Sequence, residues 1–219
     1  VYKRQASNSQ ASTVTEYIDA FHKFSQYNIH ELSMLHDFPS RLDLNRFDVI
    51  ITHYSLSLGP LIYHYLGKEL VEKIKLFTGL KVAFLQDEYR EIHTYWKNLN
   101  DLNFDILFSC VPDDEIQKVY PTQKLPDLRV VNILTGYVPE DLISKQTPLI
   151  ANRTIDVGYR SRKMPYWLGK LAYEKLSISE DFQKLALNSG LTLDISTNES
   201  DRLYGEDWIN FLTSCRAVI

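Results

Sequence analysis

The densest cluster of side chains that could bind a ligand or take part in a reaction is the hexapeptide 158–163, which reads Gly-Tyr-Arg-Ser-Arg-Lys. Its three cations stand out in a chain of 219 residues whose 24 Lys and Arg are outnumbered by 28 Asp and Glu, for a net charge of −4. Arginine forks and a lysine point charge suit the oxygens of a diphosphate. A helix beginning near Pro165 or Tyr166 would add the positive end of its dipole. The alternative is a solvated basic loop ahead of a helix. We predict that phosphate binding uses Gly158, Arg160, Ser161, Arg162 and Lys163.

Two adjacent carboxylates form a second candidate site. Asp87 and Glu88 follow an apolar run at 81–86 and stand close to Arg90. A carboxylate in this place can orient a hydroxyl group or accept its proton as a general base. In the alternative, Asp87 caps a helix and Arg90 forms a surface ion pair.

His53 is a third candidate, because it follows the apolar run 47–52 directly. An imidazole there can act as a base or can form a hydrogen bond to a phosphate or a sugar. The alternative is a structural histidine whose hydrogen bonds are satisfied within the fold. A fourth turn, 135–137, is expected to line the cleft between two domains. The other histidines show no ligand spacing, and we expect no metal site.

Composition and missing motifs exclude several classes of protein. With 44% hydrophobic and 24% charged residues, the chain is neither disordered nor a disulfide framework, and its charge argues against a general grip on nucleic acid. The phosphate-binding P-loop, the dinucleotide G-x-G-x-x-G, the G-x-S-x-G elbow and the Asp-x-Asp pair are all missing. Cys110 and Cys215 are expected to be reduced, buried thiols of a cytoplasmic protein.

The elements that must position these residues alternate between strand and helix. Continuously apolar runs, which are typical of strands buried on both faces, alternate with segments of helical periodicity. This alternation predicts an α/β fold of doubly wound parallel sheets. Ligands bind beyond the carboxyl ends of such strands, and every candidate residue stands at or next to such an end. The expected strands are 30–35, 47–52, 81–86, 104–109, 129–134, 154–159, 191–195 and 216–219. The expected helices include 13–25, 61–77, 92–99, 167–176, 179–188 and one that starts at Asp207.

The strand–helix cycle restarts after a polar connector at 139–153. We therefore predict two domains, 1–150 and 151–219. Residues 1–5 do not fit the helical pattern that begins at Thr13, and they are interpreted as non-native. We expect the first strand of the first domain to be missing and the second domain to be incomplete.

Three segments carry a resemblance to a known family. They are 11–21, which looks like a first helix, 84–90, which looks like a strand exit on the acceptor side, and 155–169, which looks like the opening of a donor domain. The chain resembles bacterial glycosyltransferases with two Rossmann-like domains, the GT-B type. The third segment is the most specific of the three.

The resemblance implies a metal-independent hexosyltransferase-like enzyme of cell-surface polysaccharide synthesis. A nucleotide-sugar donor would be a co-substrate rather than a cofactor, with its diphosphate near Arg160, Arg162 and Lys163 in the cleft between the domains. His53, Asp87 or Glu88 would be the base, and a glycan or a lipid-linked molecule would be the acceptor. The expected location is the cytoplasm, with peripheral association at the inner face of the membrane also compatible. The acidic donor-site motif of the family would lie after Ile219.

Three alternatives remain open. A sugar-nucleotide epimerase with the same architecture would convert a nucleotide sugar without an acceptor. A two-lobed small-molecule binding protein would close over its ligand. A catalytically inactive α/β module would serve protein interaction alone.

Overall fold

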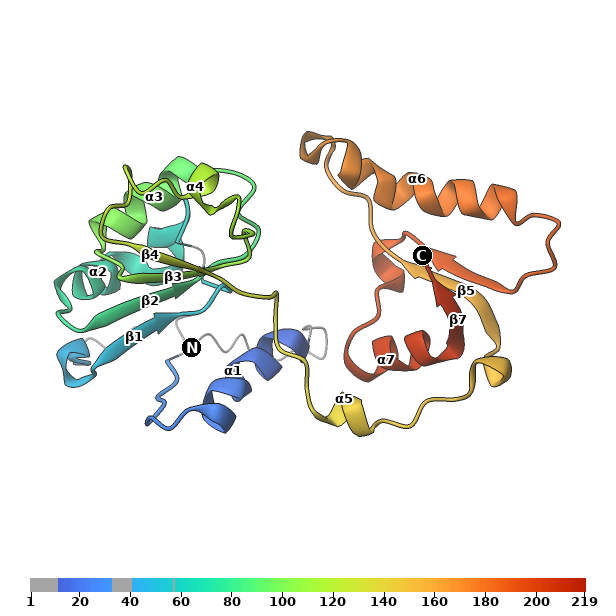
Figure 1. Cartoon of the computed structure of the whole chain (residues 1–219), viewed down its shortest axis with the longest axis horizontal. Coiled ribbons are helices and arrows are strands. Elements are labelled where there is room, and N and C mark those ends of the chain that lie inside the picture. The colour runs from blue at the N-terminus through green and yellow to red at the C-terminus, as the bar shows by residue number, and fades with distance from the viewer. Residues whose placement is uncertain (1–11, 33–40, 57) are drawn as a thin grey trace. The chain divides into compact units, whose positions relative to one another are not determined.

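A computed structural model describes residues 12–32, 41–56 and 58–219 of the chain, with Ser12 described by its backbone alone (Figure 1). Within these ranges the chain divides into two compact units, Thr13–Tyr137 (unit 1) and Val138–Ile219 (unit 2). The division falls ahead of the boundary expected at residue 150, so that the connector groups with unit 2. Both units are α/β structures with a parallel sheet, which confirms the predicted class.

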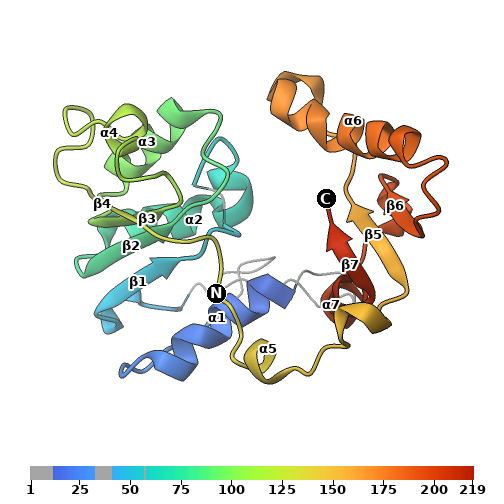
Figure 2. The same ribbon diagram turned by 45° about the vertical axis from the view of Figure 1, so that its right-hand side comes forward.

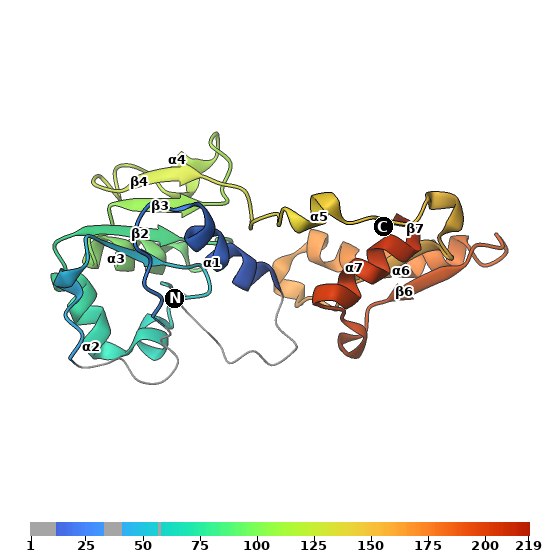
Figure 3. The same ribbon diagram turned by 90° about the horizontal axis from the view of Figure 1, so that it is seen from below.

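Unit 1 is built on a parallel sheet of four strands. The strands are β1 (Val49–Thr52), β2 (Leu80–Phe84), β3 (Ile106–Ser109) and β4 (Arg129–Asn132). They lie in the order β1-β2-β3-β4, and Figure 3 shows β2, β3 and β4 in this sequence. Every connection therefore steps in the same direction across the sheet.

The helices α2 (Ile62–Leu76), α3 (Ile92–Asp101) and α4 (Ile116–Val119) connect these strands. The apolar periodicity expected for α2 is confirmed, because its buried residues include Ile62, Leu66, Leu70 and Ile74 at intervals of four. The helix is not regular throughout, since it is kinked at Gly67, whose φ of 70° and ψ of 158° are not helical. Together with Leu99 of α3, this apolar stripe packs in one core with Ala83 and Leu107 of the sheet. The connecting helices thus lie on one face, so the described strands of unit 1 are singly wound. The doubly wound sheet predicted for this unit is wrong for these strands.

The opposite face of the sheet contacts α1 (Ser12–Phe24). Successive side chains of a strand point to opposite faces, so Phe84 faces away from the core that contains Ala83. Tyr17 and Phe21 of α1 meet the Phe84 ring edge to face, at centroid distances of 5.8 and 5.5 Å. These contacts anchor α1 on the sheet. The strand expected at 30–35 is wrong for residues 30–32, which have no regular structure, and its remainder lies outside the described residues.

Unit 2 has a parallel sheet of three strands, β5 (Ile155–Arg160), β6 (Leu193–Ser196) and β7 (Cys215–Val218). Its helices are α5 (Asp141–Ser144), α6 (Lys170–Leu185) and α7 (Gly205–Ser214). The two helices expected at 167–176 and 179–188 are one continuous helix, α6. Short 3-10 turns occupy Leu44–Arg46 in unit 1 and Ile150–Asn152, Tyr166–Leu168 and Glu199–Asp201 in unit 2.

The strand order of unit 2 is β6-β5-β7, so β5 is central. The chain leaves β5 through α6 to reach β6 on one side, then crosses through α7 to β7 on the other side. Because parallel crossovers are right-handed, two crossovers in opposite directions put their helices on opposite faces. Figures 1 and 2 show α6 and α7 on the two sides of this sheet. The sheet of unit 2 is therefore doubly wound, as predicted.

Candidate functional site

The residues expected to be functional in unit 1 all follow the carboxyl ends of its strands. His53 comes directly after β1, and Asp87 and Glu88 come shortly after β2. Cys110, which was expected to be a buried thiol, comes directly after β3 and is only half-buried, whereas Cys215 is buried as expected. Because the strands are parallel and adjacent, these exits meet at one edge of the sheet. That edge is the usual place for a ligand in an α/β sheet.

His53 is buried, with 4% of its surface exposed. The backbone N–H of Ser55 donates to Nδ1 at 3.2 Å, and the Ser55 hydroxyl lies 2.9 Å from the same nitrogen. Since Nδ1 accepts, the ring proton of the neutral imidazole is assigned to Nε2. Nε2 is buried and has no hydrogen-bond partner among the described residues.

Burial lowers the pKa of His53 to about 4, which keeps the ring neutral at physiological pH. In this geometry His53 offers an N–H donor, while the lone pair that a base needs is already engaged at Nδ1. Of the two roles predicted from the sequence, the structure favours hydrogen bonding over proton abstraction.

Two tyrosines cover the His53 ring. The Tyr54 ring lies 3.9 Å from it, centroid to centroid, and the Tyr17 ring of α1 lies 5.3 Å away. Burial, together with the nearby Cys110 and Tyr54, raises the pKa of Tyr17 to about 12, so its hydroxyl keeps its proton. No sequence pattern indicated that α1 would contribute a side chain to this edge.

Glu88 is held in place by three donors. Its Oε1 accepts hydrogen bonds from the Ser109 hydroxyl at 2.7 Å and the Tyr120 hydroxyl at 2.6 Å, and its Oε2 accepts one from the Cys110 N–H at 3.3 Å. Burial raises the pKa of Glu88 above its usual value, although these hydrogen bonds oppose the shift. The carboxylate therefore ties the β2 exit to the β3 exit, and its acceptor sites are largely occupied.

Asp87 differs from its neighbour, because its side chain is exposed. Its backbone adopts a left-handed conformation with φ of 61°, which costs free energy in a residue with a Cβ. The alternative role as a helix cap is wrong for Asp87, since α3 begins at Ile92 and Glu91 occupies the N-cap. Of the two adjacent carboxylates, Asp87 is the one presented to solvent.

In unit 2, Gly158 lies inside β5 and not in a turn. A Cβ at this position would stand 2.4 Å from the Cys215 sulfur and 2.7 Å from the ring of Phe211. Gly158 is therefore required by close packing within the sheet and α7. The expectation that it opens a phosphate-binding turn is wrong about the local structure.

Arg160, the last residue of β5, is engaged within the fold. Its guanidinium donates to a carboxylate oxygen of Asp194 at 2.7 Å and to the Asp194 carbonyl at 2.9 Å, and it lies over the Phe211 ring at 4.4 Å. Its Nε is buried without a partner among the described residues. These contacts hold the Arg160 side chain against Asp194 of the adjacent strand β6. Arg162 and Lys163 are the exposed cations of the loop.

The loop after β5 continues the sheet briefly before it turns away. The Ser161 N–H donates to the Ser196 carbonyl at 3.1 Å. Arg162 lies near enough to Glu199 to help lower the pKa of that carboxyl, after the larger effect of Arg202. The expected helix start near Pro165 is wrong, since a 3-10 turn at Tyr166–Leu168 comes first and α6 begins at Lys170.

The basic loop nevertheless occupies a special place. It follows β5, the central strand, and the two crossovers of the chain place β6 and β7 on opposite sides of this strand. In open α/β sheets the carboxyl ends of the strands at such a reversal form a crevice in which ligands bind. Arg162 and Lys163 therefore stand at the point of unit 2 that topology favours for an anionic ligand.

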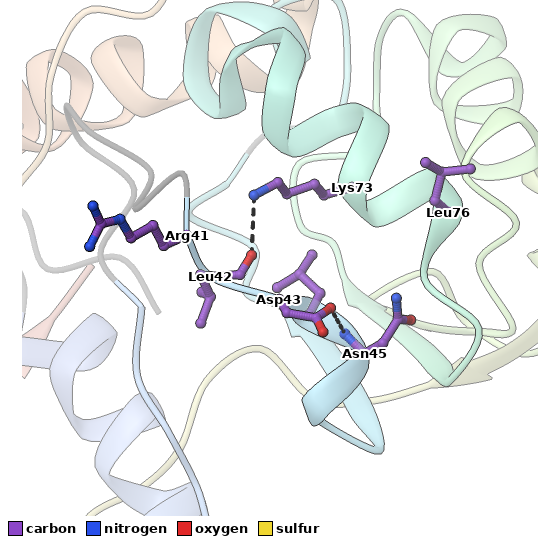
Figure 4. A pocket seen from close by; sticks show the side chains of 7 residues that line it. Arg41, Leu42, Asp43, Asn45, Lys73 and Leu76 are labelled. Carbon is purple, nitrogen blue, oxygen red and sulfur yellow. Dashed lines mark hydrogen bonds between the residues drawn. The ribbon is translucent and has the colours of Figure 1, made fainter.

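A pocket of about 290 Å³ in unit 1 lies apart from these residues (Figure 4). Its lining includes Arg41, Asp43 and Lys73, and the Lys73 ammonium donates to the Leu42 carbonyl at 3.1 Å. Residues 41–45 precede β1, so this pocket adjoins the segment that leads into the sheet. It contains none of the residues predicted to be functional.

Searches for metal-binding clusters and membrane-spanning helices among the described residues, and for similar proteins, give no further guide to function. The described residues contain no group of three or more His, Cys, Asp or Glu side chains arranged for a metal ion. A helix that crosses a bilayer needs about 20 apolar residues, and no helix in the described ranges meets this demand. Comparison with models of protein families, with characterised proteins and with solved structures finds no match.

Proposed function

We propose that the chain is a glycosyltransferase of the GT-B type, which moves a sugar from a nucleotide-diphosphate sugar to an acceptor hydroxyl. One observation carries the proposal: the exposed Arg162 and Lys163 follow β5, at the topological reversal of the unit 2 sheet. Two protein cations at this position can neutralise the charge that develops on a departing diphosphate. The donor is thereby assigned to unit 2.

The acceptor is assigned to unit 1, with Asp87 as the base. The acceptor oxygen forms a bond to the anomeric carbon while the bond from that carbon to the diphosphate oxygen breaks. The electron pair of the broken bond leaves with the diphosphate, and the hydroxyl proton passes to the Asp87 carboxylate. Asp87 is chosen because Glu88 is bound by three donors and His53 presents an N–H.

A turnover assay tests this assignment. The chain is incubated with UDP-, GDP- and ADP-hexoses and a mixture of saccharide acceptors, and nucleotide release is measured. We expect D87N to lower kcat by a factor of about 10² or more, as loss of a general base does, with KM little changed. The control E91Q removes another exposed carboxylate of the same segment and should stay within about twofold of the parent.

One observation favours a second candidate, a non-catalytic nucleotide-binding module. Two of the three groups expected to act as a base, His53 and Glu88, are engaged in hydrogen bonds within unit 1. Nucleotide binding without release of nucleotide from any donor would support this module. Conversion of a nucleotide sugar in the absence of an acceptor would instead support the epimerase.

A further inference from the structure

A pocket of about 310 Å³ lies between α1 and the turn that follows β4 in unit 1. Tyr17, Phe21 and Phe24 line it from α1, and Gly136 and Tyr137 line it from the turn. Its volume is at the lower end of the range of small-molecule sites. None of the residues predicted to hold the donor or to act as the base belongs to this lining.

The walls of the pocket are fixed by packing on both sides. Tyr17 and Phe21 are held by their edge-to-face contacts with Phe84 of the sheet. Gly136 has a φ of 83°, a conformation that favours glycine, and the turn that it makes brings Tyr137 to within 5.8 Å of the Phe24 ring, between centroids. The pocket therefore exists without a ligand to shape it.

The arrangement of the rings limits what fits between them. The Phe24 and Tyr137 planes are inclined by 56°, so they form a wedge and not the parallel slot that sandwiches a flat base. The lining that the structure describes has four aromatic rings, the small side chains of Ala20 and Ser25, and no charged side chain. The Ser25 hydroxyl accepts a hydrogen bond from the Tyr27 N–H at 3.0 Å. Such walls suit the C–H faces of a puckered, uncharged ring better than a hydrocarbon chain or an ionic group.

The Tyr137 hydroxyl supplies a hydrogen-bonding group. It is buried and has no partner among the described residues, and an unsatisfied buried hydroxyl is costly enough to need an explanation. Because the hydroxyl is buried, a ligand hydroxyl in the pocket satisfies it only after a shift of the neighbouring Phe24 ring. Apolar faces combined with equatorial hydroxyls are the chemistry of a neutral sugar.

We propose that this aromatic pocket binds a neutral saccharide ring. The role of that saccharide as the acceptor, or as the unit next to the acceptor hydroxyl, rests on the proposed transferase function, whereas the binding itself does not. The pocket then selects a glycan-bearing acceptor over a bare lipid alcohol.

Saturation-transfer NMR on the full chain tests the proposal with small probes. The probes are the methyl glycosides of glucose, galactose and mannose, together with adenosine and 1-octanol. We expect transfer to the ring C–H protons of at least one glycoside, with Y137F weakening its binding about fivefold, the effect of one hydrogen bond. F24A, which removes a ring that is 57% exposed, should weaken it at least tenfold.

The matched control is Y27A, which removes an aromatic ring that is 85% exposed and lies outside the pocket lining. It should leave glycoside binding unchanged. Binding of adenosine or octanol but of no glycoside would overturn the proposal, as would glycoside binding that is insensitive to both F24A and Y137F. These probes lack a diphosphate, so the two proposals fail separately. Glycoside binding without nucleotide binding would overturn the transferase proposal alone. Nucleotide binding without glycoside binding would overturn the saccharide pocket alone.

Discussion

The guanidinium of Arg160 and the carboxylate of Asp194 are joined across the β5–β6 pair by a hydrogen bond of 2.7 Å. The arginine is the more deeply placed partner, with 15% of its side chain exposed. This pairing divides the three cations of the loop into one that holds the sheet together and two that face solvent.

That division predicts different outcomes for neighbouring arginines. R160A removes the ion pair and the contact with the Phe211 ring, and we expect it to lower the free energy of unfolding by about 2 kcal/mol. R162A changes an exposed side chain and should stay within about 0.5 kcal/mol of the parent. Urea denaturation of the two variants measures the difference; equal stabilities would show that the Asp194 pairing contributes nothing.

Close packing at Gly158 predicts a stability defect of a different origin. G158A puts a methyl group 2.4 Å from the Cys215 sulfur, and overpacking of this kind costs about 1–3 kcal/mol. Adding C215A removes the colliding sulfur and should recover part of the loss, since the contact with Phe211 remains. If G158A were as stable as the parent, packing against Cys215 and Phe211 could not be the reason for a glycine here.

Backbone strain at Asp87 predicts that stability and activity change in opposite directions. D87G relieves the left-handed conformation and should raise the free energy of unfolding by about 1 kcal/mol, while it abolishes sugar transfer. E91G is the matched control, because Glu91 has a φ of 56°. It should gain similar stability and keep its activity. Thermal unfolding and the turnover assay together check this pair, and a D87G variant with full activity would exclude Asp87 as the base.

The buried His53 predicts acid sensitivity. Its pKa is about 4 in the folded chain and 6.5 ordinarily. Between these values the unfolded chain binds more protons, so the free energy of unfolding falls as the pH is lowered from about 6.5 to about 4, by at most about 3 kcal/mol. Glu88 has the opposite sign, because its pKa is raised and its protonation favours the folded chain.

Comparison with H53N isolates the histidine. Asparagine can still accept the Ser55 N–H but does not titrate, so the difference in unfolding free energy between parent and variant should shrink as the pH falls through this window. Denaturant titrations at several pH values measure it. Parallel curves would mean that His53 is not held neutral by the fold.

Much of the fold follows from local patterns that the sequence displays. The interval of four between Ile62, Leu66, Leu70 and Ile74 predicts α2, and the structure buries all four residues. The apolar runs at 47–52 and 81–86 contain β1 and most of β2. These elements were predictable because periodicity reports which face of an element is buried.

The roles within the site were less predictable, because they depend on partners far along the chain. Glu88 resembles Asp87 in the sequence, and only its contact with Tyr120, 32 residues away, separates an anchor from an exposed carboxylate. In the same way, Arg160 resembles Arg162 until Asp194 is placed beside it, 34 residues away. Residue type and position at a strand exit indicate which residues share one edge of a sheet, and tertiary pairing then decides which of their side chains stay exposed.

The measurement that bears most directly on the central claim is a thermal-shift titration of the chain with UDP, GDP, ADP and CMP. A nucleotide that binds the folded chain raises Tm by mass action, and saturation at about 100 times Kd adds about 2.7 kcal/mol of stability. We predict that one diphosphate nucleotide raises Tm, that R162A/K163A weakens its binding at least tenfold, and that K175A/K184A, which removes two exposed cations of α6, binds like the parent. Binding of no nucleotide, or equal binding by the parent and R162A/K163A, would contradict the assignment of the donor diphosphate to this loop.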